Sequence, residues 1–156
     1  MLRIRFTRLN PTHHRFEAIR ADGGVEMREL ETRSFLTHDL VHYAVEAEAG
    51  LQNSFYGLLS HGADYDAMQQ PISGEAMQTE FVVGPLQTAM RGKVDPEAFV
   101  MRIVEVQAQM GGAAPGWLTA DLIERVLKRL RALQGQWKAT AFGDTMELEF
   151  PPEGRG

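Results

Sequence analysis

The sequence contains no cysteine among its 156 residues. Disulfide frameworks, thiolate nucleophiles, cysteine-ligated zinc sites and iron–sulfur clusters are therefore excluded. A chain of this length can bury a hydrophobic core without such crosslinks, so a bound metal would not be needed for folding. We expect one domain over residues 1–150 and a frayed C-terminal tail, PPEGRG, over residues 151–156.

Long apolar runs are also missing. No stretch approaches the roughly 18 apolar residues of a membrane-spanning helix. The first ten residues, MLRIRFTRLN, carry arginines where a signal peptide has an unbroken apolar run. The sequence therefore predicts a soluble cytoplasmic protein with no membrane partner.

An excess of positive charge is absent as well. The formal net charge is −5 and the isoelectric point is near 5.5, whereas proteins that bind nucleic acid need a basic surface. One segment is locally basic, and its cations are Arg125, Lys128, Arg129, Arg131 and Lys138. Because no aromatic interleaving or recognition motif accompanies them, we interpret the segment as the solvated face of a helix and expect no nucleic-acid partner.

Motifs that identify common enzyme classes are missing too. No G-x-S-x-G sequence occurs, which leaves serine hydrolysis unsupported. The glycines of GGAAPG, residues 111–116, have neither the preceding strand nor the Lys-Ser/Thr pair of a phosphate-binding loop. The segment HGADYD, residues 61–66, lacks the spaced acids and distal glutamate of a calcium-binding loop. The sequence thus assigns no catalytic residue.

Alternating apolar residues at both chain ends predict an antiparallel sheet. Residues 2–7, 14–20 and 25–31 alternate with period two and are separated by turn signals, which indicates a three-stranded meander. Residues 136–142 and 145–150 suggest a C-terminal hairpin around a Gly-Asp turn. Because an isolated hairpin is marginally stable, we expect it to join the meander in one five-stranded sheet.

The region between the predicted meander and the predicted hairpin shows helical periodicity and helix-capping signals, which predict helices. Thr37 is a candidate N-cap with Asp39 in the first turn, Asp95 and Thr119 are candidate N-caps further along, and Pro85 should kink or split its helix. We expect about five helices, near residues 37–50, 54–60, 75–90, 96–110 and 120–134. The predicted fold class is α+β, with the helices packed on one face of the sheet.

Three polar residues at steps of four, His38, His42 and Glu46, share one face of the first predicted helix, opposite an apolar face. Either this face meets solvent, or the two imidazoles, one turn apart, share a divalent cation. His38 and Glu46 are separated by about 12 Å along a helix axis, so a single ion needs a third ligand from elsewhere. His61 is the first candidate, and the others are Asp64, Asp66, His13 and His14.

The segment HDLVH, residues 38–42, resembles the H-E-x-x-H motif of zinc metalloproteases in its two histidines. The resemblance covers five residues only. Asp39 occupies the position where that motif has its general-base glutamate, and the shorter side chain argues against peptidase chemistry.

Large apolar side chains near predicted loops or helix ends, namely Phe55, Tyr56, Met68, Met77 and Trp117, should enter the core or form a patch for a partner. The favoured hypothesis is a non-enzymatic binding or interaction protein with an unidentified protein partner or self-association, and it requires no cofactor. The alternative is a divalent-metal-binding protein or metal-dependent hydrolase, which would hold a metal such as zinc at His38 and His42 with Glu46, Asp39 or His61 nearby.

Overall fold

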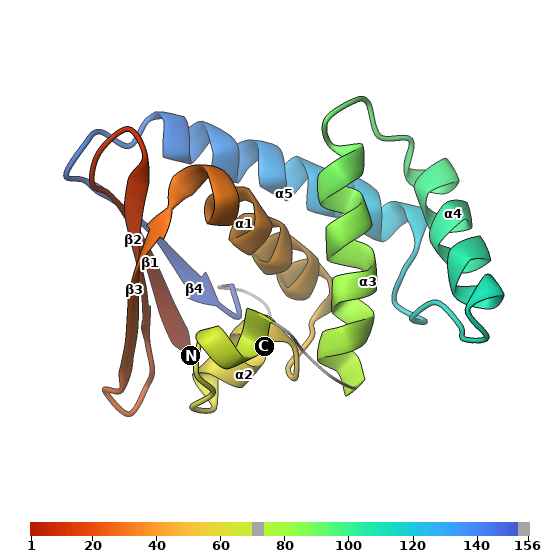
Figure 1. Ribbon diagram of the computed structural model, residues 1–156, viewed down its shortest axis with the longest axis horizontal. Helices are drawn as coiled ribbons and strands as arrows, with labels where there is room; N and C mark the ends of the chain where they lie inside the picture. Colours follow the sequence, from red (N-terminus) through yellow and green to blue (C-terminus); the bar gives the residue numbers. More distant parts are fainter. Residues whose placement is uncertain (70–73, 153–156) are drawn as a thin grey trace.

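The computed structural model describes residues 1–69 and 74–152, and within them it shows the predicted α+β fold (Figure 1). The strands are β1 (Leu2–Arg8), β2 (His13–Ile19), β3 (Val25–Glu31) and β4 (Thr145–Phe150). They form one antiparallel sheet in the order β3-β2-β1-β4. The N-terminal meander is therefore confirmed. The predicted frayed tail lies mostly outside the described residues, because the description ends at residue 152.

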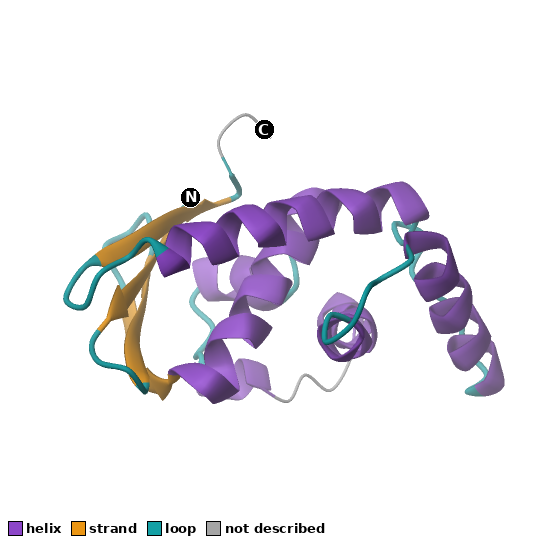
Figure 2. Ribbon diagram, turned by 90° about the horizontal axis from the view of Figure 1, so that it is seen from above, coloured by secondary structure: helices purple, strands orange, loops and turns teal. Residues whose placement is uncertain are grey.

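The helices are α1 (Thr32–Ala49), α2 (Phe55–Ser60), α3 (Gly74–Ala89), α4 (Pro96–Gln109) and α5 (Ala120–Lys138). A short 3₁₀ turn, Asp66–Gln69, follows α2. All five helices lie on the same side of the sheet, as Figure 2 shows. Within the described ranges, none of the helices has the length and apolar character that crossing a bilayer requires.

The two faces of the sheet follow the alternation of the sequence. Leu2, Ile4 and Phe6 of β1 are fully buried beneath the helices. On the opposite face, Arg5 pairs with Glu17 of β2 and with Glu147 of β4. These are cross-strand ion pairs, and they account for the charges of Arg5, Glu17 and Glu147 without a ligand.

The C-terminal hairpin is the part of the predicted sheet that the structure corrects. Residues up to Lys138 continue α5, and β4 alone joins the sheet, beside β1. Trp137 extends the buried face of α5 by one turn beyond Leu133, and the Arg8 guanidinium lies 5.3 Å from the centre of its ring. This anchoring of the last helical turn outweighs the strand propensity of the segment, so the described sheet has four strands instead of five.

Helix α1 begins five residues earlier than Thr37, directly after β3, and its N-cap residue Glu31 makes no side-chain cap hydrogen bond. The helix lies at the centre of the molecule, with the sheet, α2, α3 and α5 around it (Figure 1). Every residue from position 39 to position 48 is buried. Asp39 is therefore not a first-turn acid. On the polar face of α1, His42 and Glu46 are buried and His38 is partly exposed.

Helix α3 continues through Pro85, so the predicted break does not split it. The residue before a proline avoids helical conformation because its Cβ and its backbone N–H clash with the proline ring. Gly84 has no Cβ, which removes the Cβ part of this clash, and the helix continues to Ala89.

Two arginines of the basic segment of α5 form ion pairs that join α5 to α1. Arg125 and Arg129 bind the buried carboxylate of Glu48 on α1, at 3.0 and 2.6 Å. Lys128, Arg131 and Lys138 are exposed. Lys128, Arg131 and Lys138 thus lie on a solvated helix face as predicted, whereas Arg125 and Arg129 neutralise a buried acid of the central helix.

Candidate metal centre

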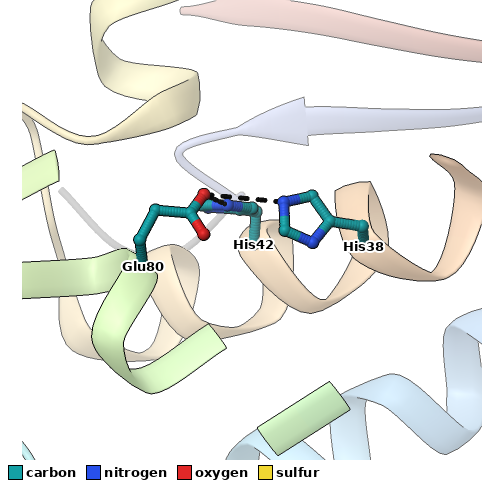
Figure 3. A group of neighbouring side chains, drawn as sticks. All are labelled: His38, His42 and Glu80. Carbon is teal, nitrogen blue, oxygen red and sulfur yellow. Dashed lines mark hydrogen bonds and ion pairs between the residues drawn. The ribbon is translucent and has the colours of Figure 1, made fainter. Parts of the chain in front are cut away.

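Three side chains from two helices converge on the buried face of α1. His38 and His42 project from α1 and Glu80 projects from α3 toward them (Figure 3). Glu80 Oε1 lies 2.5 Å from His42 Nε2 and 3.5 Å from His38 Nε2. The three donor atoms all lie within 4.8 Å of one another. Two imidazole nitrogens and one carboxylate oxygen form a donor set that divalent transition metals accept.

The second nitrogen of each imidazole also has a partner. His42 Nδ1 lies 2.9 Å from Glu46 Oε2, and His38 Nδ1 lies 3.0 Å from Gln87 Oε1. Glu46 is itself held in place, because its other oxygen accepts a hydrogen bond from the Tyr56 backbone N–H. These contacts fix both rings with Nε2 toward Glu80. The same outer contacts orient histidine ligands in metal sites.

The centre is buried on one side and reaches solvent on the other. The side chains of His42 and Glu46 are 3% and 0% exposed, whereas those of His38 and Glu80 are 26% and 27% exposed. The centre therefore lies at the edge of the core, with His38 and Glu80 on its more exposed side.

The electrostatics couple His42 to two carboxylates. Burial alone lowers the pKa of His42, but hydrogen bonds with Glu46 and Glu80 outweigh burial and raise this pKa to about 9. Burial likewise opposes ionisation of Glu80, and hydrogen bonds with His38 and His42 overcome it and lower the pKa of Glu80 to about 2. Without a metal, His42 is thus an imidazolium that donates to both acids. A metal bound at Nε2 would replace one of its protons.

Asp39 is buried beside this centre but is not one of its converging groups. Its Oδ2 accepts a hydrogen bond from the Tyr65 hydroxyl at 2.9 Å, and its Oδ1 has no hydrogen-bond partner within the described part of the chain. Burial raises the pKa of Asp39 to about 7. The residue thus packs against Tyr65, on a different side of α1 from Glu80.

The structure distributes the residues proposed from sequence as follows. His38 and His42 come together, as their spacing predicts, and Glu46 lies behind His42 at Nδ1 instead of facing the common point. His61 is an exposed C-cap residue of α2 outside the group of donor atoms within the described chain. The remaining candidates have other partners: Asp64 and Asp66 bind Arg28, His13 contacts Thr12, and His14 contacts Thr32.

Glu80 is the residue that sequence reasoning missed. It lies 38 positions after His42 in a helix that offered no recognisable motif. A weak signal exists, because Glu80 and Gln87 are seven residues apart and so lie on the same face of α3, two turns from each other. Nothing in the sequence shows that this face packs against the histidines.

The apolar residues considered for a partner surface are mostly part of the core. Phe55 and Tyr56 are buried, and Met68, Met77 and Trp117 are partly buried. Exposed large apolar side chains occur instead on α4, where Met101 and Val104 are 71% and 48% exposed. Interaction with a protein partner or a second copy stays a prediction.

No family model, curated protein or solved structure matches this chain. Arguments about its function therefore start from the geometry of its own residues.

Proposed function

We propose that the protein binds a divalent transition metal ion through His38, His42 and Glu80. One observation supports this most directly. The Nε2 atoms of both imidazoles point at the same carboxylate oxygen, while both Nδ1 atoms are held by Glu46 and Gln87. In a metal site, one imidazole nitrogen is fixed by an outer contact and the other faces the ion. Here Nδ1 of each ring has the outer contact, and a metal would replace the Nε2 proton that His42 shares with Glu80.

The three donor atoms lie within 4.8 Å of one another, and the two distances from Glu80 can be compared with the spacing that a small ion requires. Tetrahedral coordination with metal–nitrogen and metal–oxygen bonds of about 2.0–2.1 Å separates neighbouring donor atoms by roughly 3.3 Å. The distance from Glu80 Oε1 to His38 Nε2, 3.5 Å, already fits. The 2.5 Å contact between Glu80 and His42 is a hydrogen bond. It would have to lengthen by about 1 Å, which a small side-chain rotation can provide.

The donor types favour zinc or a neighbouring transition metal. Imidazole suits zinc, copper, iron and nickel, while magnesium and calcium prefer sites made of oxygen atoms alone. Three protein ligands leave one position of a tetrahedral ion free, which is the arrangement of catalytic zinc sites.

Metal-dependent hydrolysis is the second candidate function, and the open side of the centre favours it. The partial exposure of His38 and Glu80 would let water occupy the fourth position. A protein that holds the metal without catalysis requires only the three ligands. The two candidates share the same ion and differ in whether a metal-bound water attacks a substrate.

The test measures metal content and metal affinity for the full chain, purified without an affinity tag or chelator. We expect a near-stoichiometric transition metal in the wild type by elemental analysis. After chelator treatment, we expect one zinc ion to bind in calorimetric titration. Glu80→Gln and His38→Gln should each lose most of this binding, because each removes one of three ligands. Circular dichroism will confirm that the variants remain folded.

His61→Gln is the matched control, since it removes an exposed histidine outside the centre. It should bind zinc as the wild type does. Loss of binding in His61→Gln together with full binding in Glu80→Gln would assign the third ligand to His61. The absence of zinc, manganese and nickel binding by the wild type would disprove the proposed function.

A further inference from the structure

A polar cleft of about 510 Å³ lies at the first turns of α1, beside the end of α3 and near α5. The residues that line it include Arg33, Thr37, Gln87, Thr88, Arg91 and Gln134. Arg33 and Thr37 belong to α1, Gln87 and Thr88 to α3, and Gln134 to α5, while Arg91 follows the end of α3. The cleft thus brings together three segments that are far apart in the sequence.

Two cations of this cleft have no counterion among the residues that the structure describes. Within residues 1–69 and 74–152, neither Arg33 nor Arg91 makes a side-chain hydrogen bond or an ion pair. No aspartate or glutamate is among the residues that line the cleft. The chain has a net charge of −5. This cleft, with two unpaired guanidinium groups and no acid in its described lining, is instead locally positive. Such a cleft attracts anions.

The neutral groups of the cleft complement the arginines. Thr37 and Thr88 bring hydroxyl groups, and Gln134 brings an amide. The Gln87 side-chain oxygen is occupied by His38 Nδ1, which leaves the Gln87 NH₂ group available as a donor. Guanidinium, hydroxyl and amide donors together recognise an oxyanion.

The two positive charges of the cleft indicate which oxyanion fits it. A carboxylate carries one charge, which one guanidinium fork satisfies. A phosphate group carries close to two negative charges at neutral pH and has three terminal oxygens, so it can use both arginines together with the hydroxyl and amide donors.

We propose that this cleft binds the phosphate group of a small molecule or free phosphate. The site goes beyond the proposed metal function and does not depend on it, since its two cations lie outside the group of His38, His42 and Glu80. Gln87 is the one residue that belongs to both sites. A phosphorylated ligand held here would lie next to the metal centre.

The experiment titrates chelator-treated full-length protein with inorganic phosphate and with acetate at the same ionic strength, followed by calorimetry. We expect phosphate to bind more tightly than acetate. Arg33→Gln and Arg91→Gln should each weaken phosphate binding by roughly tenfold or more, because each removes a charge-assisted hydrogen-bond donor. Both arginines are exposed, so their replacement leaves the core intact. Phenyl phosphate, measured in parallel, distinguishes an organic phosphate, which would bind more tightly than the inorganic ion, from free phosphate.

Arg102→Gln is the matched control, because Arg102 is an exposed arginine on α4 outside the cleft. It should bind phosphate as the wild type does. Glu80→Gln should also retain phosphate binding, so failure of the metal proposal and failure of this one are separable. Phosphate binding no tighter than acetate binding, or unchanged in both cleft variants, would overturn the proposal.

Discussion

Gln87 on α3 places its side-chain oxygen 3.0 Å from Nδ1 of His38 on α1. Seven residues earlier on the same helix, Glu80 lies 3.5 Å from the other nitrogen of that ring. Two turns of α3 therefore fix both ends of one imidazole. This contact determines the direction in which His38 presents Nε2, even though Gln87 lies outside the group of three ligands.

Replacement of Gln87 by methionine should weaken zinc binding while keeping the helix. The variant retains side-chain length and helix propensity but cannot accept a hydrogen bond from His38 Nδ1. Loss of such an outer contact lowers metal affinity by about 10–100-fold in known sites. Zinc titration of wild type and Gln87→Met measures the change. Thr88→Ala, which alters the neighbouring exposed residue, should leave the affinity unchanged, and equal affinities for all three proteins would contradict the orienting role.

Glu46 should contribute to the stability of the fold whether or not a metal is bound. Its fully buried carboxylate accepts from His42 Nδ1 and from the Tyr56 backbone N–H. Glu46→Ala leaves an imidazolium and a backbone donor without their partner. Removal of one member of a buried ionic network costs about 3–5 kcal/mol. Urea denaturation of the wild type and the variant at neutral pH measures the difference in the free energy of unfolding.

Glu124→Ala provides the comparison for Glu46, because Glu124 is an exposed acid of α5. Its replacement should change the free energy of unfolding by less than about 0.5 kcal/mol. A Glu46→Ala variant as stable as Glu124→Ala would show that the Glu46–His42 contact is not formed in solution.

The elements that were predicted correctly depend on local rules. Leu2, Ile4 and Phe6 alternate with polar residues and form the buried face of β1. Asp95 and Thr119 cap α4 and α5 as expected, each accepting a hydrogen bond from a backbone N–H three residues later. The C-terminal hairpin was predicted wrongly because residues 136–142 have the composition of a strand. Burial of Trp137 against the sheet, which is a tertiary contact, keeps this segment helical up to Lys138.

The candidate metal centre likewise has one part that the sequence predicts and one part that depends on tertiary packing. The turn-to-turn spacing of His38 and His42 is a local property of one helix, so the sequence shows it. Glu80 and Gln87 reach the histidines only because α3 packs against α1. Periodicity alone left two interpretations of the polar face of α1, solvent exposure or metal binding, because one helix alone shows only an apolar side and a polar side. The covering of that polar side by α2 and α3 could not be read from the helix itself.

His14 should make the protein less stable as the pH falls. Its ring is fully buried against Trp137 and Phe6, and Nδ1 contacts the Thr32 hydroxyl. Nε2 has no hydrogen-bond partner in residues 1–69 and 74–152. Burial, and to a smaller extent the neighbouring His13, lowers the pKa of His14 from 6.5 to about 4. Between these two values the unfolded chain binds a proton that the folded protein does not bind. The free energy of unfolding must therefore decrease as the pH falls through this window.

His14→Phe isolates this contribution, since phenylalanine fills a similar volume and does not titrate. At neutral pH the imidazole is uncharged in both states. As the pH falls from about 7 to about 4, the wild type should lose about 3 kcal/mol more stability than the variant. Urea denaturation across this range measures both curves. His61→Gln, which removes an exposed imidazole, should follow the wild-type curve. Parallel curves for wild type and His14→Phe would show that His14 is not held uncharged inside the sheet and helix core, since only an uncharged buried imidazole produces the difference in slope.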